Sequence, residues 1–141
     1  MFYIDTSVLV AYYCPEPMSE KAEGFLIAHL RPAISTLTEV EMFSALSRKV
    51  REGGLSRKDA GDIIAKFLSH VSGHFYTYLL VEPHHFRLAR DWIGLLNTNL
   101  KTLDALHLAV AYVEDLTFVT ADQRLAESAR SLRLDVVMLK K

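Results

Sequence analysis

The sequence predicts an α/β fold in which a central parallel sheet is covered by helices on both faces. Short apolar runs alternate with longer helical stretches along the 141 residues, as in a parallel sheet whose strands are joined by helices. The runs are apolar at almost every position, which is typical of strands buried on both faces. No stretch has the length or composition of a domain linker, so we expect one domain over residues 1–141.

Five short apolar runs are the predicted strands. We expect them at Phe2–Ile4, Ala33–Ser35, Phe75–Val81, Thr117–Thr120 and Asp135–Leu139. The helical stretches between them are Ser7–Tyr13, Ser19–His29, Leu37–Val50, Arg57–Val71, His84–Leu95, Leu103–Val113 and Ala121–Arg130. The third strand is rich in aromatic residues and is either an edge strand or the tail of the preceding helix.

Residues that start and stop helices support these boundaries. The proline-containing stretch at residues 14–17 connects the first two helices. Gly53 and Gly54 can adopt the left-handed backbone that ends a helix, and Ser56 can then cap the next one. Pro83 suits the first position of a helix, because its missing N–H costs little there.

The bulk properties argue against several classes of protein. A net charge of −1 disfavours a basic nucleic-acid binder held by overall charge, although it is compatible with an enzyme that uses a local patch and a metal ion. Cys14 is the only cysteine, so no intrachain disulfide can form, which suits the cytoplasm. Asp5 interrupts the first apolar run, so we expect no signal peptide. No run approaches the roughly 18 apolar residues of a membrane span, so we expect no membrane partner.

Two carboxylates follow predicted strands at opposite ends of the chain. Asp5 comes directly after the first strand, and Asp122 follows the fourth. The carboxyl ends of parallel strands border one crevice, where ligands bind in open α/β sheets, so these acids can meet. Each acid also has a structural alternative as the amino-terminal cap of the next helix. At the first site, Thr6 or Ser7 could do the capping and leave Asp5 free.

Two glutamates compete for a third acidic position. Thr36 and Glu39 have the spacing of a capping box, in which each side chain satisfies the other residue's backbone N–H, so Glu39 has a structural task. Glu41 lies on another side of the helix, in line with Ser44 and Arg48. That stripe is either a solvated face or one wall of a polar cleft. We prefer Glu41 as the site residue, with Arg48 placed to contact a phosphate.

Asp104 and His107 share one side of a helix that is otherwise apolar. The helix dipole alone can explain an acid in the first turn, since it favours a negative charge there by roughly 0.3–1 kcal/mol. A cleft beside the sheet would explain why both polar residues share that side. We expect His107 to be a buried hydrogen-bonding partner rather than a substrate contact.

Gathering these acids has an electrostatic consequence. Two unit charges about 4 Å apart repel by roughly 4 kcal/mol at an effective dielectric of 20, so a cluster of ionised acids must take up protons or a cation. Ligand sets made only of oxygen suit Mg²⁺ or Mn²⁺. Such ions activate water and stabilise charge on a phosphoryl oxygen, which predicts phosphodiester hydrolysis without a covalent intermediate.

The same four acids lie in stretches that resemble the four motifs of PIN-domain nucleases. Phe2–Leu9 resembles the opening motif, and Ser35–Glu41 resembles the second, with Glu41 in the acidic place. Leu103–Ala109 and Phe118–Asp122 are similar to the third and fourth. Each motif alone is weakly specific, but four in order cover nearly the whole chain. The compact length resembles the VapC-type toxins of toxin–antitoxin pairs.

The resemblance implies a three-layer α/β/α fold and a Mg²⁺-dependent (or Mn²⁺-dependent) endoribonuclease. It also implies an RNA substrate, a homodimer and inhibition by a small antitoxin. One departure is Gln123-Arg124, where many relatives carry a further acid, and it calls a second metal site into question. The implied acidic site consists of Asp5, Glu41, Asp104 and Asp122, with the three aspartates as metal ligands and Thr6 and Thr120 as hydrogen-bonding support.

Other functions fit the sequence less well. An aspartyl-phosphate enzyme would use an acid after the first strand, but haloacid-dehalogenase-type enzymes need a second acid two residues later, where Ser7 stands. A binding module without turnover would use the acids only as helix caps. Zinc binding is not expected, because the adjacent His84 and His85 should diverge on a helix.

Overall fold

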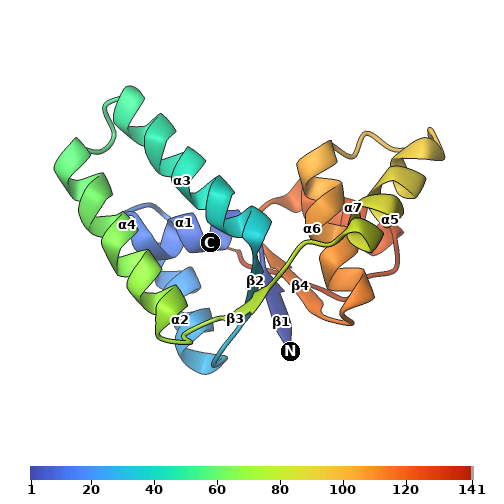
Figure 1. The fold of residues 1–141 in the computed structure, drawn as a ribbon, viewed down its shortest axis with the longest axis horizontal. Helices are drawn as coiled ribbons and strands as arrows, with labels where there is room; N and C mark the ends of the chain where they lie inside the picture. The colour runs from blue at the N-terminus through green and yellow to red at the C-terminus, as the bar shows by residue number, and fades with distance from the viewer. Residues whose placement is uncertain (141) are drawn as a thin grey trace.

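The centre of the structure is a five-stranded sheet. The computed structural model describes residues 1–140 and orders the strands β3-β2-β1-β4-β5 (Figure 1). Every pair of neighbouring strands is parallel, as predicted. The strands are β1 (Phe2–Ile4), β2 (Ala33–Ser35), β3 (Thr77–Leu79), β4 (Thr117–Thr120) and β5 (Val136–Met138).

Helices cover both faces of this sheet, which confirms the three-layer α/β/α prediction. Figure 1 shows α1 to α4 on one side of the sheet and α5 to α7 on the other. None of the helices within residues 1–140 is long and apolar enough to cross a membrane. The helices are α1 (Thr6–Tyr13), α2 (Ser19–Ala28), α3 (Thr36–Arg51), α4 (Arg57–Ser72), α5 (Pro83–Gly94), α6 (Thr102–Val113) and α7 (Gln123–Ser131).

The two central strands contribute to a core on each face, because successive strand residues point to opposite sides of a sheet. Tyr3 and Phe118 pack in the core that contains residues of α5, α6 and α7. Ile4 and Val119 pack in the other core, among residues of α1 to α4. All four side chains are fully buried, which explains why the sequence of these strands shows no polar alternation.

The third strand lies at the edge of the sheet and is shorter than the predicted stretch Phe75–Val81. Phe75 and Tyr76 precede it and pack elsewhere. Phe75 stacks on His70 with ring centroids 4.6 Å apart, and Tyr76 Oη lies 2.6 Å from Tyr13 Oη. The alternative of a helix tail is wrong, since α4 ends before this stretch. Strand β5 is also one residue shorter at each end than predicted.

Most helix boundaries follow the predicted residues. Gly53 has a φ of 80°, in the left-handed region, at the turn that follows α3. Ser56 caps α4, where its hydroxyl accepts a hydrogen bond from the backbone N–H of Asp59 at 3.0 Å. Pro83 is the first residue of α5. The two helices α3 and α4 therefore form a long hairpin, which Figure 1 shows on one side of the molecule.

The capping box of α3 is formed by residues other than those predicted. Ser35 Oγ accepts from the backbone N–H of Thr38 at 3.4 Å, and Thr38 Oγ1 accepts from the backbone N–H of Ser35 at 3.0 Å. Thr36 is already helical, and its hydroxyl accepts from the backbone N–H of Val81. The prediction of a box from Thr36 and Glu39 is therefore wrong, because β2 runs directly into α3.

The register between β1 and β4 places their carboxyl ends side by side. Ile4 pairs with Val119, and the backbone N–H of Asp5 donates to the Val119 carbonyl at 2.8 Å. Helix α1 begins at Thr6, immediately after Asp5. Asp5 and Thr120 thus lie at the same edge of the sheet, and no flexible loop separates Asp5 from its strand or its helix.

Candidate functional site

A cleft of about 470 Å³ opens at the carboxyl edge of the sheet. It is bordered by the start of α1, one side of α3 and the first turn of α6. Its polar lining includes Asp5, Thr6, Ser7, Glu41, Ser44, Arg48 and Asp104. The structure therefore brings three of the four predicted acids to one space. The predicted stripe of Glu41, Ser44 and Arg48 forms a wall of this cleft.

Asp5 is only 7% exposed and is held by two hydroxyl groups. Its Oδ2 accepts hydrogen bonds from Ser7 Oγ and Thr120 Oγ1, both at 2.8 Å. Asp5 occupies the N-cap position of α1 but makes no capping bond. The expected replacement caps, Thr6 and Ser7, donate to carboxylates instead. Both capping interpretations of this turn are therefore wrong, and Asp5 Oδ1 stays available to a ligand.

Glu41 is held by two donors that share one of its oxygens. Its Oε1 accepts from Thr6 Oγ1 at 2.6 Å and from His107 Nε2 at 2.5 Å. Burial raises the pKa of Glu41, but the hydrogen bond and charge of His107 and the Thr6 hydroxyl outweigh burial and lower it overall. Glu41 is therefore ionised at neutral pH, and neither donor engages its Oε2.

His107 is buried, as predicted, and reaches Glu41 from behind the cleft lining. Its side chain is 1% exposed, and its Nδ1 lies 2.6 Å from Tyr3 Oη. Tyr3 is a residue near the acids that the sequence does not reveal, because an apolar strand predicts packing rather than a polar contact. Its partner lies 104 positions away in the sequence. Only the tertiary structure connects the two.

Asp104 and Asp122 line a smaller pocket separate from the main cleft. Asp104 is half-buried in the first turn of α6, and the pocket that it lines with Asp122 measures about 90 Å³. Asp122 is exposed and caps α7, because its Oδ1 accepts from the backbone N–H groups of Arg124 and Leu125 at 2.9 and 3.2 Å. The capping alternative is thus confirmed for Asp122, and its Oδ2 takes part in neither bond.

Two of these acids resist ionisation. Burial raises the pKa of Asp5 against the opposing charge of His107 and two hydroxyl donors. Burial also raises the pKa of Asp104, and the charges of Asp5, Glu41 and Asp122 add to this effect. The four carboxylates therefore act on one another as an electrostatic cluster. Their oxygen-only donor set fits a hard divalent cation, which would relieve the repulsion.

No three of the four acids bring their carboxylate oxygens within 4.8 Å of one another. Within residues 1–140, the one group of three His, Cys, Asp or Glu side chains that does so with its ligand atoms is His84, His85 and Glu114. This group corrects the expectation that the two adjacent histidines diverge. His85 Nε2 lies 3.3 Å from Glu114 Oε1, and the two imidazole rings are 4.1 Å apart between centroids.

The hydrogen bonds of His85 nevertheless argue against zinc there. His85 Nδ1 accepts the backbone N–H of Glu82 at 2.9 Å. In a neutral ring the proton then sits on Nε2 and points to Glu114. Both nitrogens of the His85 ring are therefore occupied, and the group is a partly buried hydrogen-bonded contact between α5 and the end of α6 rather than a ligand set.

Comparisons with known proteins agree with this fold. The PIN domain family model matches residues 2–131. Ribonuclease VapC46 of Mycobacterium tuberculosis is 31% identical over 138 residues, which cover 96% of this chain and 95% of the relative.

Solved structures in the same comparison show the fold alone, because their sequence identity is low. The M. tuberculosis toxin VapC20, a toxin that cleaves the sarcin-ricin loop, has a TM-score of 0.73 at 16% sequence identity, and the match covers 91% of this chain and 95% of that chain. A toxin–antitoxin complex from Klebsiella pneumoniae has a TM-score of 0.70 at 15% sequence identity, and the match covers 100% of this chain and 99% of that chain.

Proposed function

The chain belongs to the PIN domain family, and on this premise we propose that it is a Mg²⁺- or Mn²⁺-dependent endoribonuclease, the toxin of a type II toxin–antitoxin pair. The cleft that gathers Asp5, Glu41 and Asp104 carries the proposal. Acids whose pKa is raised by burial and by one another's charge need protons or a cation. The similarity to a ribonuclease along almost the whole chain supports RNA as the substrate.

We assign Asp5, Asp104 and Asp122 to the metal and Glu41 to a catalytic role beside them. When bound, the divalent ion supplies an activated water and stabilises negative charge on a phosphoryl oxygen. The protein's own contribution is to hold the carboxylates in place. Thr120 donates to Asp5, and Thr6 donates to Glu41, so one oxygen of each acid is fixed and the other is left for a ligand.

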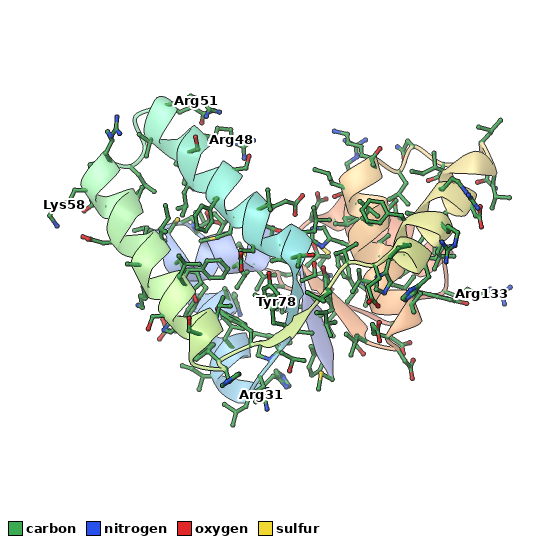
Figure 2. The ribbon with its side chains drawn as sticks, in the orientation of Figure 1. Arg31, Arg48, Arg51, Lys58, Tyr78 and Arg133 are labelled. Atoms are coloured by element: carbon green, nitrogen blue, oxygen red, sulfur yellow. The ribbon has the colours of Figure 1, made fainter. Side chains whose placement is uncertain are left out.

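Arg48 is the proposed contact to an RNA phosphate. It lines the cleft together with Glu41, near the carboxyl end of α3 (Figure 2). Its neighbour Lys49 is engaged, since Lys49 Nζ lies 3.8 Å from Glu16 Oε2, whereas Arg48 has no ion-pair partner among residues 1–140. A free guanidinium facing a cleft is well suited to a phosphate.

We further propose a cytoplasmic homodimer that a small antitoxin inhibits. The similar structure from K. pneumoniae is a toxin–antitoxin complex, which supports a protein partner. Light scattering on the purified protein tests the dimer, and a monomer at all concentrations would contradict it.

The proposed activity is tested by RNA cleavage with the purified protein. Mg²⁺ or Mn²⁺ should support cleavage, EDTA should abolish it, and Asp5→Asn should lose it. Asp59→Asn is the matched control, because Asp59 is an exposed acid in the first turn of α4. Cleavage that survives EDTA, or an Asp5→Asn protein as active as wild type after the same purification, would contradict the proposal.

One observation favours a second candidate, a PIN-like binding module without turnover. Asp122 does cap α7, so at least one predicted ligand has a structural task. Thermal melting separates the candidates. A metal site predicts that Mn²⁺ raises the melting temperature of wild type, because a ligand that binds only the folded state stabilises it. Acids that serve only as caps predict no change.

A further inference from the structure

A buried path of hydrogen bonds ends on Glu41 from the side away from the cleft. Tyr3 Oη lies 2.8 Å from Ser35 Oγ and 2.6 Å from His107 Nδ1. His107 Nε2 then reaches Glu41 Oε1. Tyr3 and Ser35 are fully buried and His107 is 1% exposed, so water cannot replace these bonds.

The hydrogen bonds along this path link Glu41 to the core through His107 and Tyr3. Glu41 is ionised and only accepts, so His107 Nε2 carries a proton and donates to it. On the other side of the ring, His107 Nδ1 is hydrogen-bonded to Tyr3 Oη, so both ring nitrogens are held. Tyr3 Oη is also hydrogen-bonded to Ser35 Oγ, which belongs to the capping box of α3. Every polar group on the path has a partner.

The path also joins the three elements that carry the cleft acids. Tyr3 lies on β1, two residues before Asp5, and His107 lies on α6, three residues after Asp104. Ser35 begins the helix that carries Glu41. A shift of β1, α3 or α6 relative to the others would break one of these bonds, so the path holds the acids at their separation.

We propose that Tyr3 and His107 are positioning residues that fix Glu41 in the proposed nuclease site. They saturate Oε1 with a donor from the core and leave Oε2 toward the cleft. A glutamate side chain has several freely rotating bonds, so without this anchor its carboxylate would sample many positions. The inference rests on the proposed function for its kinetic consequence, but its geometry can be tested without any activity.

The kinetic test uses a matched pair of tyrosines. Tyr3→Phe removes the hydroxyl and keeps the ring, while Tyr13→Phe removes an equivalent bond, since Tyr13 Oη lies 2.6 Å from His70 Nδ1 outside the cleft. For Tyr3→Phe we expect kcat to fall by roughly 10- to 100-fold, as for other residues that orient groups in a site, with KM for RNA nearly unchanged. Tyr13→Phe should keep wild-type kcat.

A second matched pair tests the histidine. His107→Leu should lose activity as Tyr3→Phe does, and His107→Gln, whose amide can still donate to Glu41, should recover part of it. His85→Leu is the control, since His85 is a buried histidine bonded to Glu114 far from the acids in sequence. Equal losses in the two leucine variants, or equal losses in Tyr3→Phe and Tyr13→Phe, would show a purely structural role and overturn the inference.

Imidazole ¹⁵N NMR decides the geometry even if the protein cleaves no RNA. Wild type should show His107 with Nε2 protonated, and Glu41→Gln should shift the Nε2 signal more than any other histidine signal. This variant changes a cleft residue and needs no core substitution to fold. If the ¹⁵N signals of His107 do not change in Glu41→Gln, the positioning role is overturned. Absence of RNA cleavage by wild type overturns the proposed function instead.

Discussion

Replacing Asp104 with asparagine should stabilise the metal-free protein near neutral pH. The side chain is half-buried in the first turn of α6, and its pKa is raised by burial and by the charges of Asp5, Glu41 and Asp122. Asparagine has almost the same shape and carries no charge. The substitution therefore removes the repulsion and keeps the space filled.

The size of the effect follows from opposing contributions. Two unit charges about 8 Å apart repel by roughly 2 kcal/mol at an effective dielectric of 20, and solvent at the half-exposed Asp104 reduces this. The helix dipole favours the aspartate by about 0.3–1 kcal/mol. Burial and the charges of Asp5, Glu41 and Asp122 raise the pKa of Asp104, and we expect these two effects to exceed the dipole. We expect a net gain of about 1 kcal/mol, or about 3 °C in melting temperature for a chain of this length.

The effect should depend on pH in one direction. The pKa of Asp104 in the folded protein lies above its ordinary value of 3.8, so the folded state binds more protons than the unfolded state. The stability from this protonation is fully present below the ordinary value and is lost as pH rises through the raised one. Wild type and Asp104→Asn should therefore be similar in acid and separate as pH approaches neutrality.

Thermal melts in EDTA across this pH range measure the difference. The control is Asp59→Asn, which removes an exposed first-turn acid of α4 outside the cleft and should be neutral or slightly destabilising. Adding Mn²⁺ should raise the melting temperature of wild type more than that of Asp104→Asn. If Asp104→Asn is no more stable than wild type without metal near neutral pH, the electrostatic coupling among these acids is refuted.

Three further changes test separate contacts. Thr120→Val removes the hydroxyl that donates to Asp5, so urea unfolding should show a loss of about 1–3 kcal/mol, whereas Thr120→Ser should stay close to wild type. Arg48→Ala should raise KM for RNA and reduce the slope of log affinity against log salt by about 0.7, the value for one phosphate contact on a single strand; Arg51→Ala, outside the cleft, should not. Gly53→Ala puts a side chain at a φ of 80°, and its melting curve should show a loss of about 1–2 kcal/mol.

The elements that the sequence predicts well are those whose residues have one dominant task. β1, β2 and β4 match their predicted bounds, because each is a short run whose side chains are buried on both faces. The predicted strand Phe75–Val81 is longer than the observed one. Its first two residues, Phe75 and Tyr76, contact His70 and Tyr13 and do not pair in the sheet. Composition alone does not separate these two uses.

The acids divide in a similar way. Helical periodicity correctly puts Glu41 with Ser44 and Arg48 on a cleft wall, since the period of a helix is local information. Local sequence does not determine whether Asp5 or Asp122 caps its helix. Both stand at N-cap positions, yet only Asp122 caps its helix. Asp5 accepts a hydrogen bond from the hydroxyl of Thr120, which lies on β4, so the role of Asp5 depends on which strands pair.

The pairing register of β1 and β4 is therefore the step on which the site depends. A slip of one residue would turn Thr120 to the other face of the sheet and away from Asp5. Strands buried on both faces have no polar alternation to define a register, so their apolar residues cannot set it. The polar residues at the strand ends can set the register. Thr120 is fully buried, and in the observed register it donates to Asp5 and accepts from the backbone N–H of Asp122. Any other register would separate the Thr120 hydroxyl from the Asp5 carboxylate, and the loss of this buried hydrogen bond would cost about 1–3 kcal/mol. The same bonds that align the strands thus also place the first acid of the cleft.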